Sequence, residues 1–222
     1  MISTGNDIVS LSAINITRTK QYKFYSKILS DSEKPLYNEF GLAGIPFESF
    51  VWLLWSIKES AYKFLQRNDP DLIFTPIKFM VEGLYLPSAY VVSGFGTTQA
   101  EGTGFDNQTC INGVVTFGSH TLYSCSLIRR EFICSVASHD DSFEKTCWGI
   151  KLIDNPDHEN QSKEVRLFLI EKLQRLYGAN DFTISKSPHN CPILLKGTEE
   201  SAIPVSLSHH EQFIAYSFQI AD

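Results

Sequence analysis

A stretch of helical periodicity at residues 48–67 constrains the fold more than any other part of the chain. At 100° per residue, its large apolar side chains fall on one broad stripe, which predicts a helix packed on a core. The stripe consists of Phe50, Leu53, Leu54, Ile57, Ala61, Phe64 and Leu65. The opposite face gathers Trp52, Ser56, Glu59 and Lys63. Glu59 and Lys63 have the spacing of an exposed ion pair, which contributes only about 0.2–0.5 kcal/mol. A tryptophan on the same face indicates instead that this face meets a ligand or another part of the protein.

The composition is that of a globular protein. The chain has 222 residues, of which 43% are hydrophobic, enough for the core of one large domain or two small ones. No run approaches the roughly 18 apolar residues that a membrane helix needs, and no signal-peptide pattern is visible, so we expect a cytoplasmic protein without membrane contact. The 5 cysteines are scattered without a C-x-x-C pair, which favours reduced thiols and argues against structural zinc.

The charge is acidic overall but unevenly distributed. A formal net charge of −6 makes the chain a poor general binder of nucleic acid, and we expect no nucleic-acid partner. Residues 17–27 nevertheless contain Arg18, Lys20, Lys23 and Lys27 and no acidic side chain. This stretch is either a solvated helix face or a surface that meets an acidic partner.

Two shorter elements are predicted before the long helix. Residues 1–11 have the alternation of a strand, with Asp7 on the apolar face, where a carboxylate is costly unless it is compensated. The residue types at positions 4–7 also favour a simple turn. Ser30 and Glu33 fit a capping box before a short helix that we expect to run to about residue 40 and to end at Gly41.

The rest of the chain reads as strands, hairpins and one further helix. Residues 73–140 are rich in strand-forming types. The glycine-rich segment 93–104 lacks the spacing of a phosphate-binding loop and is interpreted as a flexible hairpin loop. A second helix is predicted at residues 162–177, ended by Gly178. The strands predicted after it are Phe182–Lys186, Ile193–Lys196, Pro204–Ser208 and Phe213–Ile220.

A faint internal repeat relates the two halves of the chain. Residues 131–135 are similar to residues 211–215, and residues 149–153 are similar to residues 5–9. Each half would then consist of a strand, a helix and further strands, with Lys151 in the place of Asp7.

Three motifs occur in order along the chain. They are Gly5-Asn6-Asp7, then the W-x-x-K-E-S-x-x-K run from Trp55 to Lys63, and near the end Ser206-Leu207-Ser208-His209. Together with Ile28-Leu29-Ser30-Asp31-Ser32-Glu33, they resemble the signatures of the 4′-phosphopantetheinyl transferase superfamily. The order of motifs is similar to the short holo-acyl-carrier-protein synthases, whereas the length is similar to the two-lobed, single-chain members.

The resemblance implies an α+β fold of two pseudo-symmetric lobes, each a small antiparallel sheet packed on helices. Residues 1–145 would form an N-terminal lobe with the metal motifs, and residues 146–222 a C-terminal lobe with the Ser-His motif. It further implies one working site per chain, between the lobes of a monomer.

The resemblance also implies a reaction and its residues. The 4′-phosphopantetheine arm of coenzyme A would pass to a serine of an apo acyl or peptidyl carrier protein, as in fatty acid biosynthesis. Asp7 and Glu59 would hold Mg²⁺, Lys63 would reach the pyrophosphate, and Glu59 would accept the serine proton. The expected coenzyme A contacts are Ser208 and His209, with Lys58 and Lys186 as weaker candidates. The basic residues Arg18, Lys20, Lys23 and Lys27 would attract an acidic carrier protein.

Two departures from the family pattern leave an alternative open. Asn6 stands where the family has an apolar residue, and Asn190-Cys191-Pro192 stands where it has G-K-P, without the lysine. Both favour a non-catalytic relative that binds coenzyme A or a partner protein. His209, taken alone, is also compatible with a core or turn histidine. We interpret Ser138-His139-Asp140-Asp141 as a turn at the end of a strand.

Overall fold

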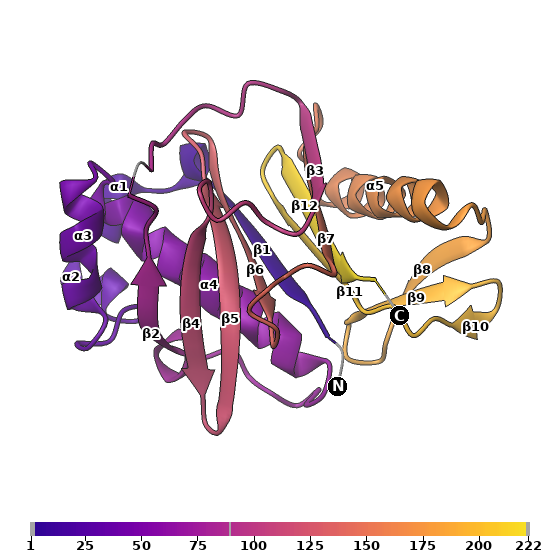
Figure 1. Cartoon of the computed structure of the whole chain (residues 1–222), viewed down its shortest axis with the longest axis horizontal. Coiled ribbons are helices and arrows are strands. Elements are labelled where there is room, and N and C mark those ends of the chain that lie inside the picture. The colour runs from indigo at the N-terminus through magenta and orange to yellow at the C-terminus, as the bar shows by residue number, and fades with distance from the viewer. Residues whose placement is uncertain (1–2, 89, 221–222) are drawn as a thin grey trace.

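The computed structural model describes residues 3–88 and 90–220, so the first two residues of the strand predicted at 1–11 lie outside the described part. The described residues form an α+β fold with antiparallel sheets (Figure 1). A five-stranded sheet has the order β1-β6-β5-β4-β2, a four-stranded sheet the order β11-β12-β7-β3, and a three-stranded sheet the order β10-β9-β8.

The strands and helices have the following bounds. The five-stranded sheet contains β1 (Gly5–Ser10), β2 (Met80–Tyr85), β4 (Ile111–Phe117), β5 (His120–Ile128) and β6 (Phe132–Ser138). The four-stranded sheet contains β3 (Gln99–Thr103), β7 (Thr146–Leu152), β11 (Val205–His210) and β12 (Phe213–Gln219). The small sheet contains β8 (Phe182–Lys186), β9 (Pro192–Lys196) and β10 (Glu199–Glu200). The α-helices are α1 (Ile16–Thr19), α2 (Tyr22–Tyr25), α3 (Tyr37–Leu42), α4 (Phe47–Gln66) and α5 (His158–Tyr177). Three 3₁₀ turns are η1 (Leu11–Ala13), η2 (Lys34–Leu36) and η3 (Pro76–Lys78).

Helix α4 buries its predicted stripe against the five-stranded sheet. Every residue of the stripe is at most 5% exposed and belongs to one apolar cluster with side chains of β2, β4, β5 and β6. The helix lies so close to β1 that a Cβ added to Gly5 would stand 2.0 Å from the Ser60 carbonyl oxygen. Glycine is therefore required here, and its absence of a side chain lets the polar face of α4 approach Asp7.

Helix α5 covers the four-stranded sheet with Phe168, Leu169 and Leu173. It begins at His158, four residues before the predicted start, because the Asp157 side chain caps it by accepting a hydrogen bond from the Asn160 N–H. It ends at Gly178, as predicted, with φ of 66°. A further apolar cluster joins the two larger sheets, so the layers run α4, five-stranded sheet, four-stranded sheet, α5, and Figure 1 shows the helices at opposite sides.

Two sequence-based expectations are wrong. The short helix does not end at Gly41, because α3 continues to Leu42 and the left-handed turn is made by Gly44, with φ of 75°. The segment 93–104 is not a hairpin loop, because its end is β3, which pairs with β7. Gly102 is needed in β3, since a Cβ there would stand 2.8 Å from the Trp148 indole. The expected division of the chain after residue 145 therefore assigns β3 to the N-terminal lobe, although β3 pairs with β7 in the sheet of the C-terminal lobe.

The register of the strands corrects the repeat. Ser10 of β1 pairs with Phe132, and Leu152 of β7 pairs with Phe213. Each pair is followed by the same hydrogen bond, from the N–H of Leu11 to Glu131 O and from the N–H of Ile153 to Gln212 O, both 2.8 Å. Counting back three residues from each pair places Asp7 opposite Ser135, and Gly149 opposite Tyr216.

Gly149, and not Lys151, is therefore the counterpart of Asp7. A Cβ on Gly149 would stand 2.5 Å from the Tyr216 ring, so an aromatic ring fills the space that a longer side chain would need. By the same register, Leu127 and Ile128 of β5 are the counterparts of Ser208 and His209 of β11.

Strands β1 and β11 lie side by side as the facing edges of the two larger sheets, and side chains join them. Ser206 Oγ accepts a hydrogen bond from the Asn6 N–H at 3.0 Å, and His210 Nδ1 accepts one from the Ser10 N–H at 2.9 Å. The Asn6 side-chain amide donates to Ser208 Oγ at 2.7 Å. This seam brings the residues of the first and last motifs together. None of the helices in the described ranges has the length and apolar character needed to cross a membrane.

Candidate active site

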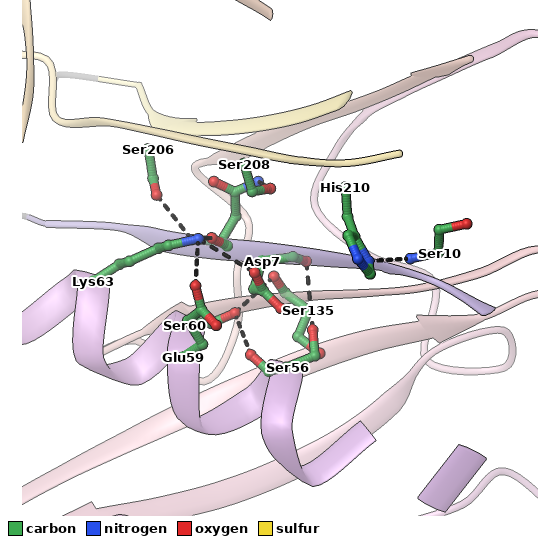
Figure 2. Close-up of polar contacts among 11 residues, drawn as sticks. Asp7, Ser10, Ser56, Glu59, Ser60, Lys63, Ser135, Ser206, Ser208 and His210 are labelled. Atoms are coloured by element: carbon green, nitrogen blue, oxygen red, sulfur yellow. Dashed lines mark hydrogen bonds and ion pairs between the residues drawn. The ribbon is translucent and has the colours of Figure 1, made fainter. Parts of the chain in front are cut away.

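Asp7, Glu59 and Lys63 meet at the seam, on the side of β1 that faces α4. Glu59 and Lys63 lie one turn apart on α4, and Asp7 projects from β1 toward them (Figure 2). Lys63 Nζ lies 3.3 Å from Asp7 Oδ1 and 3.3 Å from Glu59 Oε1, and it donates a hydrogen bond to Asn6 O at 3.0 Å. The lysine thus links the two carboxylates that the sequence predicts as metal ligands.

The environment of this triad is strongly perturbed. Burial and the neighbouring Glu59 raise the pKa of Asp7 to about 7, although Lys63 acts in the opposite direction. Burial alone would lower the pKa of Lys63, but Glu59 and Asp7 outweigh it and the pKa is raised. Asp7 is 5% exposed, and among residues 3–88 and 90–220 its buried Oδ2 has no hydrogen-bond partner. A buried acceptor without a donor indicates that this position receives a cation or a proton.

Asp7 and Glu59 fit a hard divalent cation that takes only a few of its ligands from the protein. Asp7 and Glu59 supply carboxylate oxygens, one of them unpartnered, and such cations also take waters and substrate oxygens. Across residues 3–88 and 90–220 there is no group of three or more His, Cys, Asp or Glu side chains that could hold a metal ion. These residues therefore do not form a metal site in which every ligand comes from the protein.

His209 faces a basic pocket on the other side of β11. It points away from β1, together with Leu207, because side chains alternate along a strand. The pocket has a volume of about 180 Å³ and lies between α5, β8 and β11. His158 and Arg166 from α5 line it together with Lys186 and His209, and the rings of His158 and His209 are 5.3 Å apart. Burial, followed by the charges of His158, Lys63, His210 and Arg166, lowers the pKa of His209.

A second pocket, of about 140 Å³, lies between Lys63 and the basic pocket. Lys63, Arg67 and Cys191 are among its lining residues. It shares Asn190, Pro192 and Leu207 with the basic pocket, so the two adjoin. The two adjoining pockets form a cleft with Lys63 at one end and His209 at the other, and Asp7 and Glu59 lie next to Lys63 outside its lining.

Two predicted coenzyme A contacts are corrected by the structure. Lys58 is fully buried, with Nζ 2.7 Å from Glu33 Oε2 and donating to Ile28 O at 2.6 Å, so it has no access to a ligand. Ser208 is 4% exposed and its hydroxyl accepts from Asn6, on the face of β11 opposite to His209. The two residues of the Ser-His pair therefore cannot both present their side chains to the basic pocket.

Sequence reasoning missed His158, Arg166 and Arg67. A signal for the first two was present, because His158, Ser162 and Arg166 follow one another at intervals of four residues on α5 and line the same pocket. Arg67 continues the row of Glu59 and Lys63 in the same way. What the sequence could not show is that these two helix faces meet across β1 and β11.

The basic stretch forms α1 and α2, next to the outer face of α4. Arg18, Lys20, Lys23 and Lys27 are all exposed, as the sequence pattern predicts for either interpretation. Trp52 packs on Phe24 with ring centroids 5.9 Å apart, and its indole N–H donates to Thr19 Oγ1 at 3.1 Å. The expectation that the polar face of α4 meets another part of the protein is confirmed.

Comparison with known families gives one match. Residues 3–82 match the family described as the 4′-phosphopantetheinyl transferase superfamily. The match supports, over these residues, the resemblance that the sequence motifs indicate. The superfamily segment contains Asp7, Glu59 and Lys63, whereas the basic pocket with His209 lies in the part of the chain beyond it. No curated protein and no solved structure matches the chain.

Proposed function

We propose that this protein transfers the 4′-phosphopantetheine arm of coenzyme A to a serine of an apo carrier protein. The observation that carries the proposal is the position of Lys63, which links Asp7 to Glu59 at the mouth of a cleft leading to a basic pocket. This arrangement suits a substrate with a pyrophosphate and a further phosphate. The carboxylate pair with its metal and the lysine suit the pyrophosphate, and the basic pocket suits the further phosphate.

Asp7 and Glu59 would hold Mg²⁺, which would neutralise charge on the pyrophosphate oxygens when bound. In the reaction the serine oxygen forms a bond to the β-phosphorus, and the bond from that phosphorus to the bridging oxygen breaks. The bridging oxygen keeps the electron pair and leaves as part of 3′,5′-ADP. Lys63 would bind the pyrophosphate, and Glu59 would accept the proton of the serine hydroxyl.

The nucleotide end of coenzyme A would occupy the basic pocket. His209, Arg166 and Lys186 converge there and offer donors to a phosphate group. Burial and the neighbouring cationic groups lower the pKa of His209 in the free protein. A bound phosphate would act in the opposite direction and favour the protonated imidazole. This role of His209 depends on a part of the chain outside the matched superfamily segment.

The carrier protein would approach over α1 and α2. These helices and the residues directly after them present Arg18, Lys20, Lys23 and Lys27 to solvent, beside the exposed side chains of Ile16 and Tyr22. An acidic carrier with an apolar contact surface would be attracted to this region in spite of the net charge of −6.

We further infer two lobes within one monomeric chain, residues 1–145 and 146–222, with the site between them. The equal register of β1 with β6 and of β7 with β12 supports this arrangement. A second candidate is a non-catalytic protein that binds coenzyme A. The thiol at Cys191 and the buried amide of Asn6, in place of the usual residues, favour it.

Intact-mass measurement of an apo carrier protein after incubation with coenzyme A and Mg²⁺ tests the proposal. The proposed function requires the mass to rise by one phosphopantetheine group, and Glu59→Gln to abolish the rise while the protein stays folded. Exposed Glu171→Gln on α5 is the matched control and should transfer normally. Binding of coenzyme A without any mass increase, with several types of carrier protein, would establish the non-catalytic candidate instead.

A further inference from the structure

We propose that Arg67 binds a phosphate group of coenzyme A and supplies the positive charge that the family pattern places on a lysine at position 191. This inference rests on the proposed function and adds a substrate-binding residue to its site. Nothing in the motif pattern of the sequence assigns a role to Arg67.

The position of Arg67 on α4 is the first argument. Glu59, Lys63 and Arg67 follow at intervals of four residues, so their side chains lie on one face of the helix, one turn apart. Arg67 is the C-terminal cap residue and lines the same small pocket as Lys63. A substrate whose pyrophosphate reaches Lys63 therefore has Arg67 within the same small pocket.

The contacts of the guanidinium are the second argument. Arg67 Nη1 donates to Pro192 O at 3.1 Å and to Val205 O at 2.6 Å, which fixes the group across the cleft. Within the part of the chain that the structure describes, no carboxylate forms an ion pair with Arg67, and Nε and Nη2 make no hydrogen bond. An arginine has five N–H donors, so most of them are free for an anion.

The electrostatic situation is the third argument. Arg67 is partly buried, and burial lowers the pKa of its guanidinium, but an arginine remains charged in proteins. Cys191 and Glu200 act in the opposite direction, but among the described residues no carboxylate forms an ion pair with the guanidinium, and partly buried charges are normally paired. A phosphate oxygen in the adjacent pocket of about 140 Å³ would provide the missing partner.

The neighbouring loop explains why the charge is needed on α4. Cys191 lines the same pocket and occupies the position of the lysine in the G-K-P pattern. The carbonyl next to it, Pro192 O, is the acceptor for Arg67. The guanidinium therefore lies beside the place from which a lysine at position 191 would reach the cleft.

The test is the affinity for coenzyme A, measured by isothermal titration calorimetry with Mg²⁺ present. Arg67→Gln should weaken binding about tenfold to a hundredfold, the range expected for a charge-assisted contact to phosphate. The double variant Arg67→Gln with Cys191→Lys should recover most of this loss. The control Arg175→Gln, at an exposed pair with Glu101 outside the cleft, should bind as wild type.

The double variant separates binding from support of the fold. A lysine at position 191 restores the charge but not the hydrogen bonds to Pro192 O and Val205 O. Unchanged affinity in Arg67→Gln, or a loss that Cys191→Lys leaves in place, would overturn the inference. If Arg67→Gln does not fold, Arg67→Lys decides: it keeps the charge but loses the planar donor group, and it should bind within about tenfold of wild type. A loss of about a hundredfold in that variant would contradict the inference.

The proposed function and the role of Arg67 can be tested separately. A wild-type protein that does not bind coenzyme A overturns both statements. Binding without transfer overturns the enzymatic function and leaves the role of Arg67 standing. Transfer by wild type together with unchanged affinity in Arg67→Gln overturns the role of Arg67 alone.

Discussion

Lys58 and Glu59 are neighbours in the sequence but have opposite environments. Glu59 lies at the cleft with a partly exposed side chain, whereas Lys58 and its partner Glu33 are both 0% exposed. Glu33 also accepts hydrogen bonds from the N–H groups of Ser30 and Val81. The pair therefore holds the segment after α2 and the start of β2 against α4, and so fixes the rotation of the helix that presents Glu59.

Removal of one partner of this pair should destabilise the fold. Lys58→Met leaves the Glu33 carboxylate buried without its cation, and we expect a loss of about 3–5 kcal/mol in the free energy of unfolding. Urea denaturation followed by circular dichroism measures it. The double variant with Glu33→Leu should recover part of the loss, because no buried charge remains. A stable Lys58→Met protein that loses only coenzyme A affinity would restore the original assignment of Lys58 as a ligand contact.

Binding of Mg²⁺ at Asp7 should depend on pH. The pKa of Asp7 is raised to about 7, so below that pH the carboxyl group holds a proton that a cation must displace. The apparent affinity for Mg²⁺, with coenzyme A present, should rise by up to about tenfold per pH unit until about pH 7 and then level off. Calorimetry in buffers of different ionisation enthalpy should detect the released proton. Asp7→Asn should abolish both signals, and a pH-independent affinity between pH 6 and 8 would contradict this account.

At the residue scale, the sequence predicts which residue types form the site better than it predicts where their side chains point. The spacing of Glu59 and Lys63 places them on one helix face, and the structure brings both to Asp7. The adjacent Ser208 and His209 were expected to act together, but strand alternation turns them to opposite faces. The prediction did not contain this result, because the predicted strand ended at Ser208, whereas β11 continues through His209 to His210. The burial of Lys58 was not predictable either, since it depends on Glu33, twenty-five residues away in the chain.

Among the elements, the two long helices were predictable and β3 was not. Helices α4 and α5 have apolar stripes and stop signals of their own, which local periodicity reveals. Strand β3 is short and partly exposed, contains Gly102, and exists because it pairs with β7, far along the chain. Pairing of this kind leaves no local pattern in the residues. For the same reason the sequence does not predict the seam, where side chains of β1 and β11 join strands that are far apart in the chain.

The helices α1 and α2 can be tested as a docking surface. Reversal of Arg18 and Lys23 to Glu should raise the KM for the carrier protein about tenfold or more and leave that for coenzyme A nearly unchanged. The effect should shrink at high salt, because exposed charges are screened. Steady-state kinetics with each substrate varied in turn gives both values. The control is the pair Lys163→Glu and Arg175→Glu on α5, away from these helices. Equal losses for both substrates would count against docking here.

The whole molecule depends on how the two larger sheets meet. His210 Nδ1 accepts the hydrogen bond from the Ser10 N–H, which requires that nitrogen to be unprotonated. Burial lowers the pKa of His210, although Glu211 and Glu59 act against this. The unfolded chain therefore binds the proton more readily. The contribution of His210 to stability is complete above its ordinary pKa of 6.5 and is lost as the pH falls below it.

Wild type should accordingly lose more stability between pH 7.5 and pH 5 than His210→Asn, by about 0.5–1.5 kcal/mol. Asparagine keeps an acceptor for Ser10 but does not titrate. The comparison of wild type with variant isolates His210 from Asp7, whose raised pKa acts in the opposite direction. Denaturation curves across this pH range give the difference, and parallel pH profiles would show that the seam does not respond to protonation.

The ring of Tyr216 has a consequence for stoichiometry. It occupies, beside Gly149, the space that corresponds to Asp7 in the other sheet, so an acidic side chain stands at this register position in only one of the two sheets. Assemblies of identical subunits repeat each binding position as often as they repeat the chain. Here the two halves have become unequal, and titration with coenzyme A should saturate at a single molar equivalent, without a second, weaker phase.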